Sequence, residues 1–365
     1  MISPTNAQEL ADALKSATKT IQLGGAFSKD AAGGPIAPAE TVITTSAMKR
    51  VLQYEPKDLT ISVEAGLPYA ELTKLIAENR QMIPLDPPYS ATATIGGVIA
   101  ANSSGPRRRL FGTARDLVIG MQFATVEGKV VQSGGMVVKN VAGLDMSKLM
   151  IGSLGTLAAI TSVNFKLIPM PDATRTFVMA FNSAEAAMQG RALLYESSLQ
   201  PYALDMLNPA AATAVGRNGY LVIAQAGGSD ALMERYQRSL KTAEMISGDE
   251  ETALWTAIRE FTPNFLAANP NGAVQRSSRT VTALTSVIAR PQPVVSRAAT
   301  GVSYVYYCDC EQCPAEDLIE FAPVSRKSKL NLWPTTGGDF TIMQKIKHMF
   351  DPRNLLNPGR LYGRL

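Results

Sequence analysis

The stretch ATIGGVIAANSSGPRRRLFG, residues 93–112, decides what kind of fold to expect. Apart from two isoleucines and a valine, it carries no side chain larger than Asn102 before Pro106, and three arginines then follow in a row. A backbone can lie against a flat ligand or a pyrophosphate only where side chains do not hold it away, and its N–H groups can then bind phosphate oxygens. The stretch therefore predicts a main-chain surface for a cofactor.

Two further stretches have the same composition. They are LGGAFSKDAAGGP, residues 23–35, and GSLGTLAAIT, residues 152–161. Neither matches the dinucleotide fingerprint G-x-G-x-x-G or the P-loop G-x-x-x-x-G-K-[ST], which argues against a Rossmann dehydrogenase or a P-loop NTPase. Three such stretches indicate a long, phosphate-containing cofactor laid in a groove, although the glycines could instead serve close packing of strands on helices.

Composition and charge exclude several other classes of protein. Of the 365 residues, 46% are hydrophobic and 18% are charged, and the net charge is only +4, which does not indicate a nucleic-acid binder. We find no apolar run near the ~20 residues that cross a bilayer. The first residues lack a cationic leader followed by an apolar core. We therefore expect a cytoplasmic protein, with docking onto the inner face of a membrane through partners left open.

Hydrophobic periodicity divides the chain into two mixed regions. Up to about residue 170, helical spacing in NAQELADALKSA (6–17) alternates with strand-like runs such as TISV (60–63) and a hairpin turning at Glu127-Gly128. Beyond it, the strand-like RTFVMAF and GYLVIAQAGG alternate with the helical runs 183–197 and 231–246. This second pattern predicts an antiparallel sheet carrying helices on one face, and the whole chain is expected to be α+β.

Four longer stretches resemble one family. They are EPKDLTISVEAGLPYAEL (55–72), IPLDPPYSATATIGGVIAANSSGPRRRLFGTARDLVIG (83–120), GGMVVKNVAGLDMSKLMIGSLGTLAAIT (134–161) and DPRNLLNPGRLY (351–362). They resemble the FAD-binding, PCMH-type fold of the vanillyl-alcohol oxidase family, and within it the FAD-binding subunits of bacterial glycolate oxidases. The N-terminal glycine loop departs from the GGGTS that is usual in the family.

The resemblance implies a domain plan and a set of cofactor-binding residues. Residues 1–170 would form the FAD-binding domain, with subdomains at about 1–85 and 86–170. Residues 171–335 would form a smaller α+β cap domain, and the helix and tail 336–365 would return to the FAD site. The residues implied to bind FAD are Gly24, Gly25, Pro87, Pro88, Thr94, Ile95, Gly96, Gly97, Ser104, Gly105, Gly112, Gly155, Ile160, Asn357 and Arg360.

The arginines and cysteines leave alternatives open. Arg107–Arg109 could neutralise phosphate or a substrate carboxylate, bind a partner subunit, or form a solvated loop, and the resemblance favours the flavin or the partner. The three cysteines, Cys308, Cys310 and Cys313, could supply corners of a metal site. We favour a polar loop with reduced thiols, and we assign no metal site.

Covalent attachment of flavin in this family commonly uses a histidine or cysteine near the N-terminal loops. The first cysteine here is Cys308 and the single histidine is His348, so FAD is expected to be bound noncovalently. Oxidation of a 2-hydroxy acid also needs a base for the hydroxyl proton. His348 is expected to face solvent or to lie at a helix end, and the sequence selects no catalytic residue.

These observations lead to three hypotheses about function. The first is an FAD-binding subunit of a glycolate (2-hydroxy acid) oxidase complex, working in electron transfer with a homologous catalytic flavoprotein subunit and an iron–sulfur subunit. The second is a self-sufficient FAD-dependent oxidoreductase of another alcohol or hydroxy acid, with Arg107–Arg109 or Arg279 binding a carboxylate. The third is a flavin-free scaffold subunit.

Overall fold

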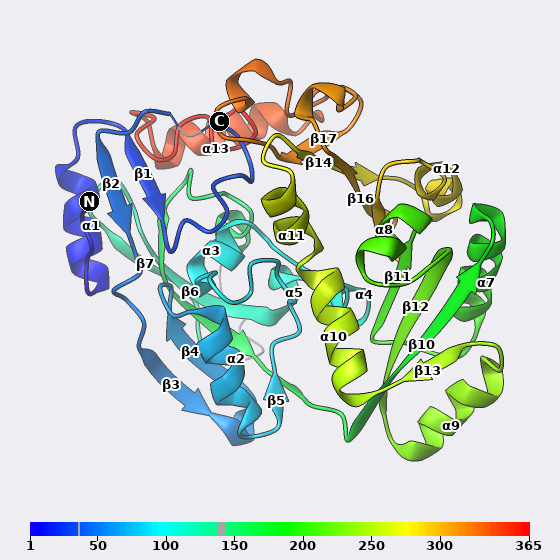
Figure 1. Ribbon diagram of the computed structural model, residues 1–365. Helices are drawn as coiled ribbons and strands as arrows, with labels where there is room; N and C mark the ends of the chain where they lie inside the picture. Colours follow the sequence, from blue (N-terminus) through cyan, green and yellow to red (C-terminus); the bar gives the residue numbers. More distant parts are fainter. Residues whose placement is uncertain (36, 138–143) are drawn as a thin grey trace. The chain divides into compact units, whose positions relative to one another are not determined.

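Residues 1–35, 37–137 and 144–365 are described by the structure, a computed structural model (Figure 1). The stretch KNVAGLD, residues 139–145, falls mostly outside them. The chain divides into two units. Unit 1 comprises Met1–Ser103, Thr113–Met170 and Val324–Leu365, and unit 2 comprises Ser104–Gly112 and Pro171–Pro323.

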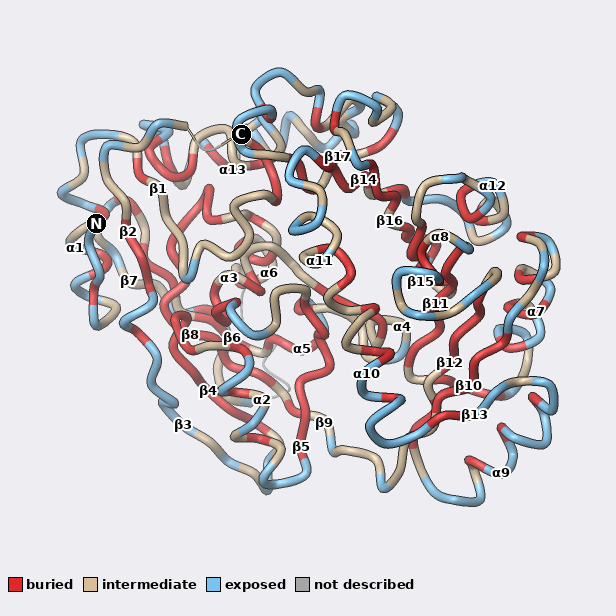
Figure 2. Tube along the Cα trace, in the orientation of Figure 1, coloured by how far each residue is buried: buried red, intermediate tan, exposed pale blue. Residues whose placement is uncertain are grey.

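Unit 1 is built on an antiparallel sheet of five strands. Their order is β3 (Val51–Glu55), β4 (Thr60–Glu64), β8 (Ala159–Lys166), β6 (Val118–Ala124) and β7 (Val130–Gly134). Figure 2 shows the three inner strands buried along their length, whereas the edge strand β3 is mostly exposed. Two smaller sheets pair β1 (Ile21–Gly24) in parallel with β2 (Thr41–Thr44), and β5 (Gln81–Met82) with β9 (Ile168–Pro169).

The helices of unit 1 follow the apolar spacing of the sequence. They are α1 (Ala7–Ser16), α2 (Tyr69–Ala77), α3 (Ile95–Ala100), α5 (Ala114–Leu117), α6 (Ser147–Met150) and α13 (Phe340–Phe350), with 3-10 turns at Pro56–Asp58 and Lys327–Lys329. In α1, the Asn6 side chain caps the N-terminus by accepting the Glu9 N–H at 3.0 Å. Leu10 and Leu14 of α1 are fully buried, as their spacing predicts.

Unit 2 is built on an antiparallel sheet of eight strands. Their order is β13 (Glu244–Ile246), β10 (Ala173–Phe181), β12 (Tyr220–Gly228), β11 (Ala203–Leu207), β15 (Val294–Arg297), β16 (Val302–Tyr307), β14 (Ala273–Ser278) and β17 (Leu318–Phe321). Its helices are α4 (Arg108–Phe111), α7 (Ala184–Glu196), α8 (Pro209–Ala214), α9 (Asp230–Ser239), α10 (Gly248–Arg259), α11 (Phe261–Ala268) and α12 (Leu284–Ile288), with 3-10 turns at Val281–Ala283 and Cys310–Gln312. The predicted α+β class is confirmed.

Two details of unit 2 differ from the expectations. Helices cover both faces of the sheet, because Phe177 of β10 packs with α7, α9 and α12 in one core, while Thr176 beside it accepts the indole N–H of Trp255 from α10 at 2.7 Å. The helix expected over residues 231–246 ends at Ser239, and residues 244–246 form β13 instead. Tertiary pairing with β10 outweighs helix propensity there.

The C-terminal tail of unit 1 is tied to α13 and β1. The Asp351 carboxylate accepts the Leu355 N–H at 3.0 Å and the Leu356 N–H at 2.7 Å. Lys347 of α13 donates to that carboxylate at 2.6 Å and to the Leu356 carbonyl at 3.1 Å. The tail then runs beside β1, where the Ile21 N–H donates to the Leu355 carbonyl at 2.8 Å. In the described part of the chain, we find no helix long and apolar enough to span a membrane.

The buried pair of Lys347 and Asp351 gives a test of this anchoring. Changing Lys347→Met leaves the carboxylate buried without its cation, and we expect the free energy of unfolding to fall by about 3 kcal/mol. Urea denaturation measures this, with Lys345→Met, an exposed lysine of the same helix, as the matched control that changes little. Equal stability of the two variants would contradict the anchoring role.

Candidate functional site

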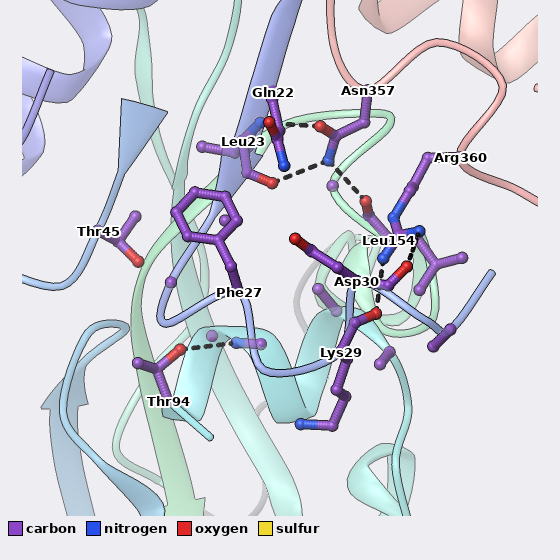
Figure 3. A pocket seen from close by; sticks show the side chains of 18 of the residues that line it. Gln22, Leu23, Phe27, Lys29, Asp30, Thr45, Thr94, Leu154, Asn357 and Arg360 are labelled. Carbon is purple, nitrogen blue, oxygen red and sulfur yellow. Dashed lines mark hydrogen bonds between the residues drawn. The ribbon is translucent and has the colours of Figure 1, made fainter. Parts of the chain in front are cut away.

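Unit 1 contains a pocket of about 980 Å³, its open mouth included. Five parts of unit 1 line it: β1 with the loop that follows it, Thr45 after β2, α3 from Thr94 to Ala101, residues 154–160, and the C-terminal tail at 357–360. Figure 3 shows Asn357 and Arg360 reaching the pocket from the tail, while Thr94 lies at the start of α3.

The pocket brings together most of the residues that the resemblance implied. Those that line it are Gly24, Gly25, Thr94, Gly96, Gly97, Gly155, Ile160, Asn357 and Arg360. Pro87 and Pro88 are not among the lining residues, and Ile95 is fully buried in the core beneath α3. Ser104, Gly105 and Gly112 belong to unit 2 and do not line the pocket either.

Two glycines explain why side chains are missing here. A Cβ on Gly25 would lie 2.0 Å from the Thr94 Oγ1, which no real contact allows. A Cβ on Gly97 would meet only that same oxygen, at 3.2 Å, and would otherwise occupy the space of the pocket. Gly25 is therefore needed for the fold of the loop, and Gly97 keeps the pocket open.

Several residues around the pocket adopt backbone conformations that side chains rarely take. Phe27, Leu154 and Asn357 all have positive φ, at 54°, 53° and 42°. Such conformations cost on the order of 1–3 kcal/mol each and persist where surrounding contacts hold them, often at functional sites. Leu154 is held by its N–H, which donates to the Ala100 carbonyl at 2.8 Å.

Asn357 closes the pocket by joining three segments of the chain (Figure 3). Its side-chain oxygen accepts the Leu23 N–H at 2.8 Å, and its amide donates to the Leu23 carbonyl at 3.0 Å and the Leu154 carbonyl at 2.9 Å. The side chain therefore extends the hydrogen bonding of β1 and fixes the loop at Leu154. Its amide group is therefore hydrogen-bonded to main chain in the wall of the pocket.

Two basic side chains, the buried Lys327 and the partly buried Arg360, hold the loop after β1. The Arg360 guanidinium donates to the carbonyls of Lys29 at 2.7 Å, Asp30 at 3.2 Å and Gly34 at 2.9 Å. The Lys327 ammonium donates to the carbonyls of Asp30 and Ala32 at 2.8 Å each, and to that of Gly34 at 3.3 Å. Main-chain carbonyls, which carry no sequence signal, therefore bind both cations.

The pocket wall formed by the loop after β1 has a net positive charge. Burial, with a smaller contribution from Arg360, lowers the pKa of Lys327 to about 6. Burial also lowers the pKa of Arg360 and raises that of the Asp30 carboxyl, which both cations partly offset. Lys327 is therefore mostly uncharged near neutral pH, but Lys29 and Arg360, which line the pocket, still outnumber the one acidic group at this wall, so an anionic ligand would be favoured.

Sequence reasoning missed several of these residues. Phe27 and Leu154 sit inside the quoted glycine stretches, and their proximity to those glycines was the available signal. Lys327 lies in RKSKL, a polar run typical of an exposed loop, and nothing in the sequence marks it as buried.

The other candidate residues are not among those that line the pocket. His348 is exposed in the last turn of α13, and Arg279 pairs with Asp317 at 2.8 Å. Cys308 is exposed, Cys310 is buried, and burial together with Cys310 raises the pKa of the half-buried Cys313 to about 12. Within the described ranges, no group of three or more His, Cys, Asp or Glu side chains could hold a metal ion.

The arginine run makes contacts within unit 2. Arg108 donates to the Ser104 hydroxyl at 3.2 Å, and Arg109 donates to the Pro201 carbonyl at 2.8 Å and to the Gln200 side chain at 2.9 Å. At least Arg108 and Arg109 are therefore held by the protein itself.

Comparison with protein families gives two matches. A family model for an FAD binding domain matches residues 1–134, and one for the C-terminal domain of FAD linked oxidases matches residues 326–361. These two matched segments contain most of the residues that line the pocket.

Curated relatives match most of the chain. It is 27% identical to glycolate oxidase subunit GlcE of Escherichia coli K12, over 93% of this chain and 92% of that protein. It is 25% identical to glycolate oxidase subunit GlcD of Bacillus subtilis, over 88% and 79%. It is 26% identical to a D-2-hydroxyglutarate dehydrogenase of Xanthomonas citri, over 90% and 81%.

Solved structures share the fold. p-Cresol methylhydroxylase with substrate bound matches with a TM-score of 0.77 at 13% identity, over 99% of this chain and 88% of that one. Alkyldihydroxyacetonephosphate synthase matches with a TM-score of 0.70 at 16% identity, over 98% and 76%. At these identities the likeness concerns the fold alone.

Lys327 gives a pH test of the pocket wall. Its pKa is about 6 in the folded chain and near 10.5 when unfolded, so the unfolded chain binds more protons between these values. The cost of burying the charge is complete below pH 6 and falls as pH rises. Relative to Lys327→Met, the wild type should therefore gain stability from pH 6.5 to 9.5, by at most about 1.4 kcal/mol per pH unit. Urea denaturation at each pH measures this, and a constant difference would refute it.

Proposed function

Because the chain belongs to the flavoprotein family of FAD-linked oxidases with a PCMH-type FAD-binding domain, we propose that the pocket of unit 1 binds FAD. The protein is an FAD-linked oxidoreductase. We further propose that it is the FAD-binding subunit of a 2-hydroxy-acid oxidase complex of the glycolate oxidase type. The match to GlcE, which spans 92% of that subunit, is the observation that carries this proposal.

The residues of the pocket fit the cofactor. Main chain from the loop after β1 and from α3 borders a space that a Cβ on Gly97 would fill. A dinucleotide needs such uncluttered backbone for its pyrophosphate, and the positive wall with Lys29 and Arg360 suits its charge. FAD, when bound, supplies a two-electron acceptor for the hydride of an alcohol.

The pocket suggests roles for those lining residues that the family resemblance implied. Gly24, Gly25, Gly96 and Gly97 let the backbone approach the pyrophosphate, with Thr94 capping α3 by accepting the Gly97 N–H at 3.3 Å. The family resemblance assigns Gly155 and Ile160 to the adenosine end and places Asn357 and Arg360 near the flavin. The contacts of Asn357 and Arg360 point to a positioning role, since the Asn357 amide and three Arg360 N–H groups bind main chain.

Noncovalent binding is part of the proposal. Among the described residues that line the pocket there is no histidine or cysteine, the side chains through which this family commonly attaches flavin. Denaturing the protein in acid should therefore release free FAD.

The position of the single histidine also supports the role as one subunit of a complex. His348 is exposed on α13 and is not among the residues that line the pocket. We propose that a homologous catalytic flavoprotein subunit oxidises the substrate and that an iron–sulfur subunit carries electrons onward. A self-sufficient dehydrogenase is the second candidate, favoured by the match to D-2-hydroxyglutarate dehydrogenase over 90% of this chain.

Gly97→Val tests the cofactor site. The Cβ of the valine would meet only the Thr94 hydroxyl, at 3.2 Å, and the side chain would intrude on the pocket, so we expect a folded protein with at least tenfold less bound FAD. Absorbance of the purified protein in the visible flavin band measures occupancy. Gly338→Val is the matched control, because a Cβ there meets nothing within 4 Å in an exposed segment. Full FAD occupancy in the Gly97 variant would rule out this placement.

Activity assays separate the two candidate functions. If the chain is one subunit of a complex, the purified protein should be yellow but should reduce an acceptor dye with glycolate only after the proteins that co-purify with it in its native host are added. Steady-state rates with a panel of 2-hydroxy acids measure this. Turnover by the purified chain alone would favour the self-sufficient dehydrogenase.

A further inference from the structure

Lys327 holds the loop that forms one wall of the pocket, although its own side chain is not among those that line it. Its Nζ donates to the carbonyls of Asp30 and Ala32 at 2.8 Å each, and to that of Gly34 at 3.3 Å. Asp30 and Ala32 themselves line the pocket. Only 1% of Lys327 is exposed, so these carbonyls take the place of water around its amine.

The loop has little freedom to adjust to a change at Lys327. Gly33 has a φ of +66°, and a Cβ there would lie 2.8 Å from the Arg360 carbonyl oxygen. A Cβ on Gly34 would lie 1.9 Å from the Gly359 carbonyl oxygen, and the Gly34 N–H donates to the Arg360 carbonyl at 2.7 Å. The loop and the C-terminal tail are therefore in direct main-chain contact, and the loop cannot move closer to the tail.

The number of carbonyls around Lys327 matches the number of N–H groups on an ammonium. A protonated lysine has three N–H donors and no acceptor, whereas the neutral amine has two donors and a lone pair. In the neutral form, the lone pair of Lys327 would face one of the three carbonyl oxygens. Hydrogen bonds from a charged donor are also roughly twice as strong as those from a neutral one. The loop is therefore held more firmly when Lys327 is protonated.

Burial and neighbouring charges decide how easily Lys327 is protonated. Burial opposes the charged form most, Arg360 on the tail opposes it as well, and Asp30 on the loop favours it. The pKa of Lys327 is therefore lowered to about 6 in the chain by itself. The other titratable residues of the loop, of the tail after Asn357 and of the segment around Lys327 are Lys29, Tyr362, Arg364, Arg326 and Lys329.

An anion in the pocket would shift this balance toward the ammonium. The pyrophosphate of a dinucleotide is negatively charged, and a negative charge favours the protonated form of a nearby base. A ligand that raises the pKa of a group takes up a proton as it binds, and by linkage its affinity then depends on pH. Lys327 is suited to such coupling because its amine is bound to the main chain of the pocket wall.

We propose that Lys327 couples FAD binding to proton uptake, so that the loop after β1 binds the cofactor with Lys327 protonated and releases it more readily with Lys327 neutral. The proton comes from solvent and bonds to the lysine Nζ, and no other covalent bond changes. Below about pH 6 the amine is already charged, whereas above it FAD must bring a proton, so affinity falls as pH rises. Lys327 is thus a positioning residue, and this inference rests on the proposed function.

The test measures the dissociation constant of FAD for the full-length protein at several pH values, from the flavin fluorescence that appears as the holoprotein is diluted. For the wild type, we expect the affinity to fall by at least about tenfold between pH 6.5 and 8.5. K327R stays charged over this range, so its affinity should be the same at both values. K345R is the matched control, because Lys345 is exposed on α13, and it should keep the pH dependence of the wild type.

Two further variants separate Lys327 from its neighbours. K327M removes the amine, so it should bind FAD more weakly than the wild type at pH 6.5 and show no change with pH. D30N removes the neighbouring carboxylate but keeps the titrating amine, so its affinity should still fall as pH rises. If K327R does not fold, titration of FAD in two buffers of different ionisation enthalpy counts the protons directly. The wild type should take up a proton between pH 6.5 and 8.5, and K327M should take up none.

Two outcomes would overturn the proton coupling. One is an FAD affinity of the wild type that stays constant from pH 6.5 to 8.5. The other is a pH dependence that persists in K327M, because another group would then carry the proton. A chain that binds no FAD at any pH would overturn the proposed function as well, whereas a flavoprotein of constant affinity would overturn only the coupling.

Discussion

The pocket of unit 1 depends on the return of the C-terminal tail to the first strand. Asn357 pairs with the main chain of β1, while Lys327 and Arg360 bind the carbonyls of the following loop. These contacts join residues that are about 300 positions apart in sequence. Without them, the Leu23 main chain and the carbonyls of Lys29, Asp30 and Gly34 would lose these partners.

Binding cations through carbonyls has an electrostatic consequence. Carbonyl dipoles stabilise the Arg360 guanidinium but do not cancel its charge, so this wall keeps a positive group. If a carboxylate accepted these N–H groups in place of the main-chain carbonyls, its negative charge would repel a phosphate. The geometry therefore serves two purposes at once, because the same groups that order the loop also favour an anionic cofactor beside it.

The two faces of the sheet in unit 2 differ in composition. One face is apolar and packs with α7, α9 and α12, as in an ordinary α+β domain. The other face carries aromatic contacts, such as those of Tyr306 with Phe261 and Phe265, together with the buried ion pair of Arg297 and Asp205. Burying two charges is costly, and this pair is tolerated because each group supplies the counter-charge of the other.

The sequence by itself determined the α+β class, the main strands and helices, and the glycine stretches that border the pocket, because these depend on local periodicity and on backbone access. It did not predict that Ile95 is buried in the core, or that Ser104, Gly105 and Gly112 belong to unit 2 and are not among the residues that line the pocket. Burial and the division into units depend on contacts across the whole chain. It also gave no sign of Lys327. Only the tertiary structure decided those points, because a lysine bound by main-chain carbonyls has partners that any sequence would provide.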